Sequence, residues 1–227
     1  MAREIKLISS MAAKDFLLDI AKQYQIDTGG VVSVTTVGGV EVMRRVKAGE
    51  ALDGVVLSAE QIDQLIADGA IARGSRIDLV KSGVAVAVRK GAARRDISSE
   101  AAVKKAVLGS RSVGYSTGPS GVYLERLLAT WDPDKRVKRV QAAPGTPVGS
   151  LVANGEVELG FQQLSELIHL QGIELLGPLP AAIQLMTVFS GGVSIKSTQP
   201  EAARAALGYM ASAKALEAKR RNGLSAA

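Results

Sequence analysis

Apolar stretches rich in β-branched residues alternate with amphipathic stretches of helical period along this chain, and this alternation constrains the fold more than any other feature. In the first third, strands are predicted at residues 4–9, 31–35 and 53–58. Each is followed by a predicted helix that ends at a glycine, such as Gly29, Gly49 and Gly69. Strands and helices that alternate at this spacing predict an α/β fold, a mostly parallel sheet with helices on both faces.

Two long β runs, at residues 79–89 and 182–195, divide the sequence. Between them the strand–helix alternation repeats, and after the second run a final helix is predicted at residues 200–218. Two crossings through long strands make one lobe an insertion in the other. We therefore predict a discontinuous lobe I of residues 1–80 plus 184–227, and an inserted lobe II of residues 81–183.

The composition excludes several kinds of site. The chain has 227 residues and no cysteine, so it has no disulfide, thiolate metal site or cysteine nucleophile. Its one histidine, His169, lies in a predicted helix with no cluster at metal-ligand spacing, which favours a packing or surface role over a metal site. The glycine pairs match neither a dinucleotide-binding nor a P-loop motif, and no Ser/His/Asp set can be assembled. We expect no cofactor and no metal.

The charge balance bears on possible partners. The net charge is +6, but the basic residues are scattered and lack interleaved aromatics, so nucleic acid is not an expected partner. A positive field would raise the encounter rate with a small anion. No apolar run approaches the length of about 18 residues that a spanning helix needs, so we expect no membrane insertion. No signal-peptide pattern precedes Ile5, which predicts a cytoplasmic protein, or a periplasmic one if a leader has been removed.

Four loops that lead from a strand into a helix are rich in glycine, serine or threonine. A helix start offers unpaired N–H groups and a positive dipole end, glycine permits close approach of an anion, and a hydroxyl adds a donor. Any one such loop is ordinarily a cap or a turn. Because two loops fall in each predicted lobe, the pattern favours an anion site. The loops are Ser9–Met11, Val37–Gly39, Thr117–Gly121 and Pro144–Val148.

Several short motifs occur in a consistent order over nearly the whole chain. They are Leu7-Ile8-Ser9-Ser10-Met11, Ala51-Leu52-Asp53-Gly54-Val55-Val56-Leu57-Ser58, Gly118-Pro119-Ser120-Gly121-Val122-Tyr123, Leu159-Gly160-Phe161-Gln162-Gln163 and Lys219-Arg220-Arg221-Asn222-Gly223-Leu224. With these motifs the chain resembles the molybdate-binding-protein-like branch of bacterial solute-binding proteins, which have the periplasmic binding protein type II fold. That resemblance implies two lobes joined by two strands, and an oxyanion bound in the cleft by neutral donors.

The resemblance also implies a set of ligand-binding residues. Gln163 stands where molybdate binders typically have a tyrosine, and Gly38 and Gly39 stand in a loop that is serine-rich in those binders. Both departures remove hydroxyl donors, so we favour an organic carboxylate over molybdate. The predicted ligand-binding residues are Ser9, Ser10, Met11, Gly38, Gly39, Gly118, Ser120, Gly121, Thr146, Val148 through its N–H, Gln162 and Gln163.

Three functions share this fold. The first is binding of a small anion by closure of two lobes, with the transporter partner left open. The second is a cytoplasmic, cofactor-independent isomerase of unsaturated polycarboxylates, because the Gly160–Glu166 stretch resembles a leaderless subgroup that includes aconitate isomerase. The third, a regulator's effector domain, is disfavoured because no helix-turn-helix precedes Ile5. A proton shift needs one acid/base group, for which the candidates are Ser10, Tyr115, Tyr123 and Thr146, and the catalytic residue stays unknown.

Overall fold

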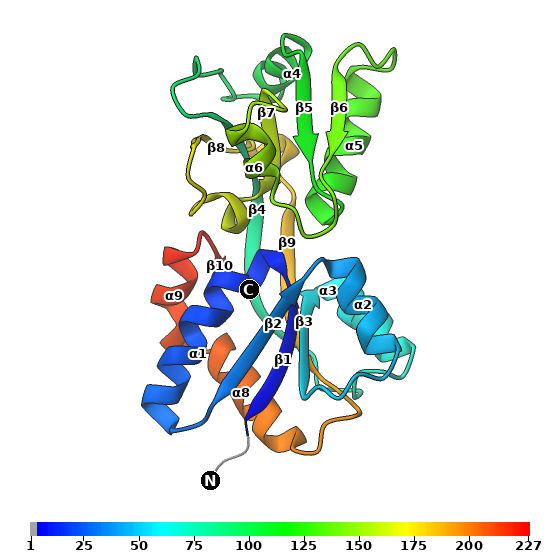
Figure 1. Cartoon of the computed structure of the whole chain (residues 1–227), viewed down its shortest axis with the longest axis vertical. Coiled ribbons are helices and arrows are strands. Elements are labelled where there is room, and N and C mark those ends of the chain that lie inside the picture. The colour runs from blue at the N-terminus through cyan, green and yellow to red at the C-terminus, as the bar shows by residue number, and fades with distance from the viewer. Residues whose placement is uncertain (1–3) are drawn as a thin grey trace. The chain divides into compact units, whose positions relative to one another are not determined.

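The computed structural model describes residues 4–227 and has the α/β architecture that the sequence predicts. The chain divides into two compact units. The first unit contains the chain up to Ser82 together with Val188–Ala227, and the second contains Gly83–Thr187. Met1–Arg3, on which part of the leader argument rests, lie outside the described residues. Figure 1 shows the order of the elements within each unit.

Three parallel strands form one side of the first unit's sheet, with β2 at the edge (Figure 1). They are β1 (Ile5–Ser10), flanked by β2 (Val32–Val37) and β3 (Gly54–Ser58). Ser10 lies opposite Val37, and Ser9 lies opposite Val56, so the carboxyl ends of the three strands meet at one edge. The strand β9 (Met186–Val193) runs antiparallel along β3 and closes the other side.

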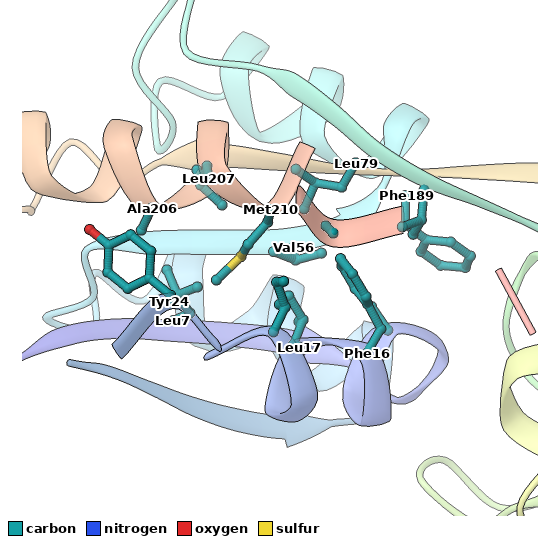
Figure 2. Close-up of a cluster of buried hydrophobic side chains, with 14 of the residues drawn as sticks. Leu7, Phe16, Leu17, Tyr24, Val56, Leu79, Phe189, Ala206, Leu207 and Met210 are labelled. Carbon is teal, nitrogen blue, oxygen red and sulfur yellow. The ribbon is translucent and has the colours of Figure 1, made fainter. Parts of the chain in front are cut away.

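Side chains that alternate along these strands fill two cores, one on each face of the sheet. Leu7 and Val56 pack beneath α1 (Lys14–Thr28) and α8 (Pro200–Ala211), with Phe16, Leu207 and Met210 completing the layer in Figure 2. On the opposite face, Ile8, Val55 and Leu57 pack beneath α2 (Gly39–Lys47) and α3 (Ala59–Ala67). Each helix packs its apolar side against one face of the sheet and turns its polar side outward, which explains the amphipathic pattern of its sequence.

The second unit repeats the plan. Its parallel strands are β5 (Ser112–Tyr115) at the centre, β6 (Lys138–Gln141) and β7 (Leu159–Gln163), with the long strand β4 (Ile77–Arg89) antiparallel to β7. Tyr115 lies opposite both Gln141 and Phe161, so these strands also end at one edge. The helices are α4 (Glu100–Leu108), α5 (Pro119–Trp131), α6 (Val148–Ala153) and α7 (Leu164–Leu167).

Three elements differ from the sequence prediction. The β run predicted at residues 182–195 begins only at Met186 and ends at Val193, because Ala181–Ile183 form the short helix η2. Residues 173–178, to which no strand was assigned, form β8, which pairs antiparallel with β4. The single helix predicted at residues 200–218 is interrupted at Ser212, whose hydroxyl donates to the Tyr209 carbonyl at 2.7 Å and whose backbone is extended. The chain continues as η3 (Ala213–Ala215), α9 (Leu216–Arg221) and the short strand β10 (Ser225–Ala226).

The C-terminal Lys219–Leu224 motif is explained by packing inside the first unit. Lys219 is 1% exposed, and its Nζ donates to the Ala211 carbonyl at the end of α8 at 3.1 Å. Arg221 and Asn222 both donate to Asp19 of α1. The motif therefore fixes α9 between α1 and the end of α8. Within residues 4–227, no helix combines the length and apolarity that crossing a bilayer requires.

Candidate functional site

At the carboxyl edge of the first unit, Ser10 has a buried hydroxyl without a partner. The turn after β1 is η1 (Met11–Ala13), which leads into α1, and Ser10 precedes it without a side-chain capping bond. Its Oγ is buried and has no hydrogen-bond partner. The neighbouring Ser9 is different, because its Oγ donates to the Ser10 carbonyl at 3.0 Å. Of the predicted residues in this loop, Ser10 therefore keeps hydrogen-bonding capacity for a ligand.

Beside this turn, α2 begins at two predicted residues, Gly38 and Gly39. The Val42 N–H donates to the Gly38 carbonyl at 3.0 Å, so the N–H groups of Gly39 and Val40 precede the first intrahelical bond. A Cβ on Gly39 would meet nothing closer than Gln61 Nε2 at 3.5 Å, an ordinary contact. Neither crowding nor backbone conformation requires glycine at position 39. Close approach of a ligand to the backbone would explain it.

In the second unit, the loop between β5 and α5 and the first turn of α5 contain two glycines, Gly118 and Gly121, that differ in the room available for a Cβ atom. A Cβ on Gly121 would lie 1.7 Å from the Ser116 carbonyl oxygen, so packing alone requires that glycine. Its N–H also donates to the Gly118 carbonyl at 2.9 Å. Gly118, in contrast, has space for a Cβ, whose nearest neighbour would be Ser116 Oγ at 3.7 Å. The buried Ser120 hydroxyl shares a hydrogen bond of 3.3 Å with Ser116.

At the start of α6, a predicted ligand donor already has a partner inside the second unit. The Val148 N–H, which was expected to donate to the ligand, donates to Gln162 Oε1 at 2.8 Å. Gln162 is 2% exposed, and its Nε2 donates to Glu166 Oε1 at 2.8 Å. Both ends of the Gln162 amide are thus used inside the unit. A side chain from β7 already occupies the Val148 donor, so its ligand role stays a prediction that requires this hydrogen bond to open.

Glu166 is a functional candidate that the sequence analysis did not single out. It lies in α7, directly after β7, and burial raises the pKa of its carboxyl group to about 7, although the hydrogen bond from Gln162 opposes this shift. A carboxyl group that titrates near neutrality can take up and return a proton. Glu166 ends the Gly160–Glu166 stretch that resembles the isomerase subgroup, but nothing in the local pattern reports its burial.

Gln163, the next predicted residue, has an amide that is bound at one end. Its side chain is 1% exposed, and its Nε2 donates to Thr187 Oγ1 at 2.8 Å. Its Oε1 is buried and has no partner. The second unit therefore also presents an unsatisfied polar atom at a predicted ligand position, at the edge where β7 ends.

Two of the four acid/base candidates named from the sequence, Tyr115 and Tyr123, take part in packing or hydrogen bonding inside the second unit. The Tyr123 hydroxyl donates to the Ile183 carbonyl at 2.8 Å, and burial raises the pKa of Tyr123. Tyr115 is a buried member of the core beneath α5, and burial raises its pKa as well. The Thr146 N–H donates to the Ala143 carbonyl at 2.9 Å. Neither tyrosine is suited to exchange a proton near neutral pH.

Charged side chains are absent from the predicted donor set, which consists of backbone amides, hydroxyls and amides of glutamine. His169 is exposed and lies just beyond α7. Across residues 4–227, no group of three or more potential ligands among His, Cys, Asp and Glu could hold a metal ion. The strand edge of each unit thus offers hydrogen bonds from neutral groups, and in the second unit Glu166, directly after β7, has a pKa raised to about 7.

Comparison with known proteins agrees with this architecture. Residues 5–225 match the family described as bacterial extracellular solute-binding protein. The aconitate isomerase of a Pseudomonas species is 38% identical over 227 residues, which cover 97% of this chain and 87% of that protein. Two solved structures share the fold. The periplasmic molybdate-binding protein of Azotobacter vinelandii has a TM-score of 0.77, 20% identity, and coverage of 98% of this chain and 99% of that one.

The second solved structure is L-phospholactate-bound PEB3, a protein of Campylobacter jejuni, with a TM-score of 0.71 and 14% identity, covering 98% of this chain and 100% of that chain. At such identities the likeness shows the fold alone. The family match and the similarity to aconitate isomerase extend over nearly the whole chain and therefore show the family of this protein. The chain belongs to the bacterial extracellular solute-binding protein family.

Proposed function

We propose that this protein binds a small organic carboxylate through neutral hydrogen-bonding groups that both units contribute. One observation carries the proposal. Among the described residues three buried polar side-chain atoms lack a partner, Ser10 Oγ, Arg139 Nε and Gln163 Oε1, and Ser10 in the first unit and Gln163 in the second were predicted to bind a ligand. A buried polar group without a partner costs about 1–3 kcal/mol. A ligand that bonds to Ser10 and Gln163 would recover that free energy.

The chemistry of the donors favours a carboxylate over molybdate. An amide side chain at position 163 and glycines at positions 38 and 39 replace hydroxyl donors, and an organic acid offers both acceptors and carbon-bound groups of varied shape. The names of two relatives support this direction. One is an isomerase of aconitate, and the other holds phospholactate. Backbone N–H groups at the start of α2 would bind the carboxylate oxygens.

Thermal unfolding with a panel of ligands tests the proposal. The panel contains citrate, cis- and trans-aconitate, malate, succinate, molybdate and tungstate. A carboxylate at about 100 times its dissociation constant is expected to raise the free energy of unfolding by about 2.7 kcal/mol. Stabilisation by molybdate or tungstate, with none of the carboxylates active, would overturn the ligand class.

Isomerisation of an unsaturated polycarboxylate is a second candidate function, favoured by two specific observations. The first is the 38% identity to aconitate isomerase, and the second is a carboxyl group, Glu166, whose pKa is raised to about 7. Moving the double bond removes a proton from one allylic carbon and adds a proton to the other end of the three-carbon unit. One group that loses and regains a proton near neutral pH can serve both steps.

Proton NMR of the vinylic signals tests this second function. The protein is incubated with cis-aconitate or trans-aconitate, and interconversion is compared with a blank. If the protein isomerises aconitate with Glu166 as the acid/base, Glu166→Gln should abolish turnover and keep the hydrogen bond from Gln162. Stabilisation by aconitate without any interconversion would eliminate the enzyme and leave the binding function intact.

A further inference from the structure

The Gln162 amide has one orientation, and a backbone N–H group fixes it. Gln162 is the next-to-last residue of β7 and is 2% exposed. Its Oε1 accepts a hydrogen bond from the Val148 N–H at 2.8 Å. A backbone N–H can only donate, so a reversed amide would place two donors against each other. The NH₂ end of the amide is therefore left for a second partner.

That second partner is a carboxyl group. The Nε2 of Gln162 donates to Glu166 Oε1 at 2.8 Å, and Glu166 lies in α7, four positions further along the chain. An amide NH₂ group donates and does not accept, so Glu166 must offer it an acceptor whether the carboxyl group is ionised or protonated. The carbonyl oxygen of a carboxylic acid is its better acceptor. The proton of the neutral acid is then carried by the other oxygen, Oε2.

The surroundings of Glu166 leave this hydrogen bond as the main polar influence on its carboxyl group. Among the elements in contact with α7, β7 and α6 contain no charged residue. The side chain of Leu167 also packs with β4 and β8, whose charged residues are Asp78, Lys81, Arg89 and Glu174. Within residues 4–227, burial raises the pKa of Glu166 and the Gln162 hydrogen bond lowers it, with no charge among the causes.

We propose that Gln162 is a positioning residue for Glu166: its NH₂ group binds one carboxyl oxygen and leaves Oε2 as the atom of that group that takes up and returns a proton. This inference rests on the isomerase candidate of the proposed function and deepens it by naming the atom that exchanges the proton. A carboxyl group bound at one oxygen also rotates less, which keeps the other oxygen in a constant direction.

The proton transfer balances on this one atom. An allylic C–H bond of the substrate breaks, its proton goes to Oε2, and the electron pair left behind spreads over the three-carbon unit. The new O–H bond then breaks as a C–H bond forms at the other end of that unit. The carboxyl group ends in its starting state, and the double bond has moved by one position.

Titration of Glu166 by carbon-13 NMR of its carboxyl group tests the positioning role directly, with Glu166→Gln identifying the signal. Gln162→Met keeps the length of the side chain and removes the amide. The pKa of Glu166 should then rise by about one pH unit or more, the effect expected for losing a hydrogen bond to a charged group.

Gln162→Glu is a second variant, because it keeps an acceptor for the Val148 N–H and loses the donor to Glu166. The two carboxyl groups would share one proton and hold it to a higher pH than the wild-type protein does. If Gln162 only held the start of α6 in place, this variant would leave the titration unchanged.

The pH dependence of aconitate isomerisation is the second measurement. Ionised Glu166 removes the proton, so turnover by the wild-type protein should rise with pH through about 7. In Gln162→Met the same rise should be displaced to higher pH. A displacement of about one pH unit makes the variant about fivefold slower at pH 7 and nearly equal to wild type at pH 9. A misfolded fraction of the protein would not regain turnover at high pH.

Gln64→Met is the matched control. The Nε2 of Gln64 donates to Asp68 Oδ1 at 2.8 Å with the same spacing of four residues, but this pair is exposed on the first unit. The control should leave the titration of Glu166 and the turnover unchanged. Melting temperatures of all the variants are measured alongside to show that each is folded.

The outcomes separate this inference from the proposed function. An unchanged pKa of Glu166 in Gln162→Met, or turnover that falls by the same factor at every pH, would overturn the positioning role. A raised pKa of Glu166 in Gln162→Met, in a protein whose wild type does not interconvert the aconitates, would instead overturn the isomerase function. The assignment of the exchanging proton to Oε2 would then stand without a reaction to serve.

Discussion

At the strand edge of each unit, packing or an internal hydrogen bond explains some residues, while others have no such structural explanation. Gly121 is required by the Ser116 carbonyl, whereas a Cβ on Gly39 would find an ordinary environment. The same contrast separates Ser9, whose hydroxyl is used within its own turn, from Ser10, whose hydroxyl is buried without a partner. Residues without a structural explanation are the best positions at which to test ligand binding.

Gly39→Asp is expected to abolish carboxylate binding, because it places a negative charge at the start of α2, where the ligand's own charge would lie. The control is Gly208→Asp in α8, where a Cβ meets nothing within 4 Å. Calorimetric titration should show binding lost in the first variant and kept in the second. If Gly39→Asp binds with unchanged affinity, that loop is a turn and nothing more.

The raised pKa of Glu166 predicts that the free energy of unfolding depends on pH. Because its folded-state pKa is raised from 4.5 to about 7, the folded protein holds a proton that the unfolded chain releases. This contribution to stability is complete below about pH 4.5 and is lost as the pH rises through about 7, with a slope of up to about 1.4 kcal/mol per pH unit. Glu166→Gln should flatten that part of the stability curve in urea titrations. Identical curves for the two proteins would show that Glu166 is not shifted.

At the scale of elements, helix starts and strand starts are fixed by contacts between segments that lie far apart in the sequence. The first turn of α5 packs directly on the backbone of Ser116. The start of β3 is held by Asp53, which accepts hydrogen bonds from the Lys6 N–H, the Ser197 hydroxyl and the Gln199 amide. Asp53 thereby joins β1, β3 and the segment that follows β9.

The start of α5 can be tested with two alanine substitutions. Gly121→Ala should lower the melting temperature markedly, because its methyl group would lie 1.7 Å from the Ser116 oxygen and must displace the helix. Gly118→Ala has room for the methyl group and should leave the melting temperature within a degree or so, while weakening binding if a ligand approaches this backbone. A stable Gly121→Ala protein would contradict the packing account.

Asp53→Ala should destabilise the protein by about 3 kcal/mol, the range for losing one or two hydrogen bonds to a charged group. Although burial opposes it, the three hydrogen bonds hold the pKa of Asp53 below its usual value, so its contribution is present above about pH 3.8 and is lost on acidification. Glu217→Ala, in an exposed ion pair with Arg220, is the control and should cost less than about 1 kcal/mol. Equal effects of the two substitutions would refute a special role for Asp53.

For the whole molecule, the central question is whether both units serve the same ligand. Ser10 belongs to the first unit and Gln163 to the second. If one carboxylate uses both, Ser10→Ala and Gln163→Leu should each raise its dissociation constant about fivefold or more, the loss of roughly 1 kcal/mol per hydrogen bond. Calorimetry measures both variants against the same ligand. An effect confined to one variant would assign the ligand to a single unit.

The sequence by itself determined the alternation of strands and helices, the strand edges at which glycines and serines gather, and the family resemblance. These features are local: hydrophobic period, capping and turn chemistry depend on residues a few positions apart. The interrupted final helix and β8 escaped prediction because Ser212 and residues 173–178 owe their conformations to partners elsewhere in the chain or to a competing hydrogen bond.

Only the tertiary structure decided which polar groups stay available to a ligand. Gln162 takes the Val148 N–H, Thr187 takes one end of the Gln163 amide across 24 positions of sequence, and burial moves Glu166 toward neutrality. The physical reason is that hydrogen-bond satisfaction and desolvation depend on which segments pack together, and residue spacing does not report this.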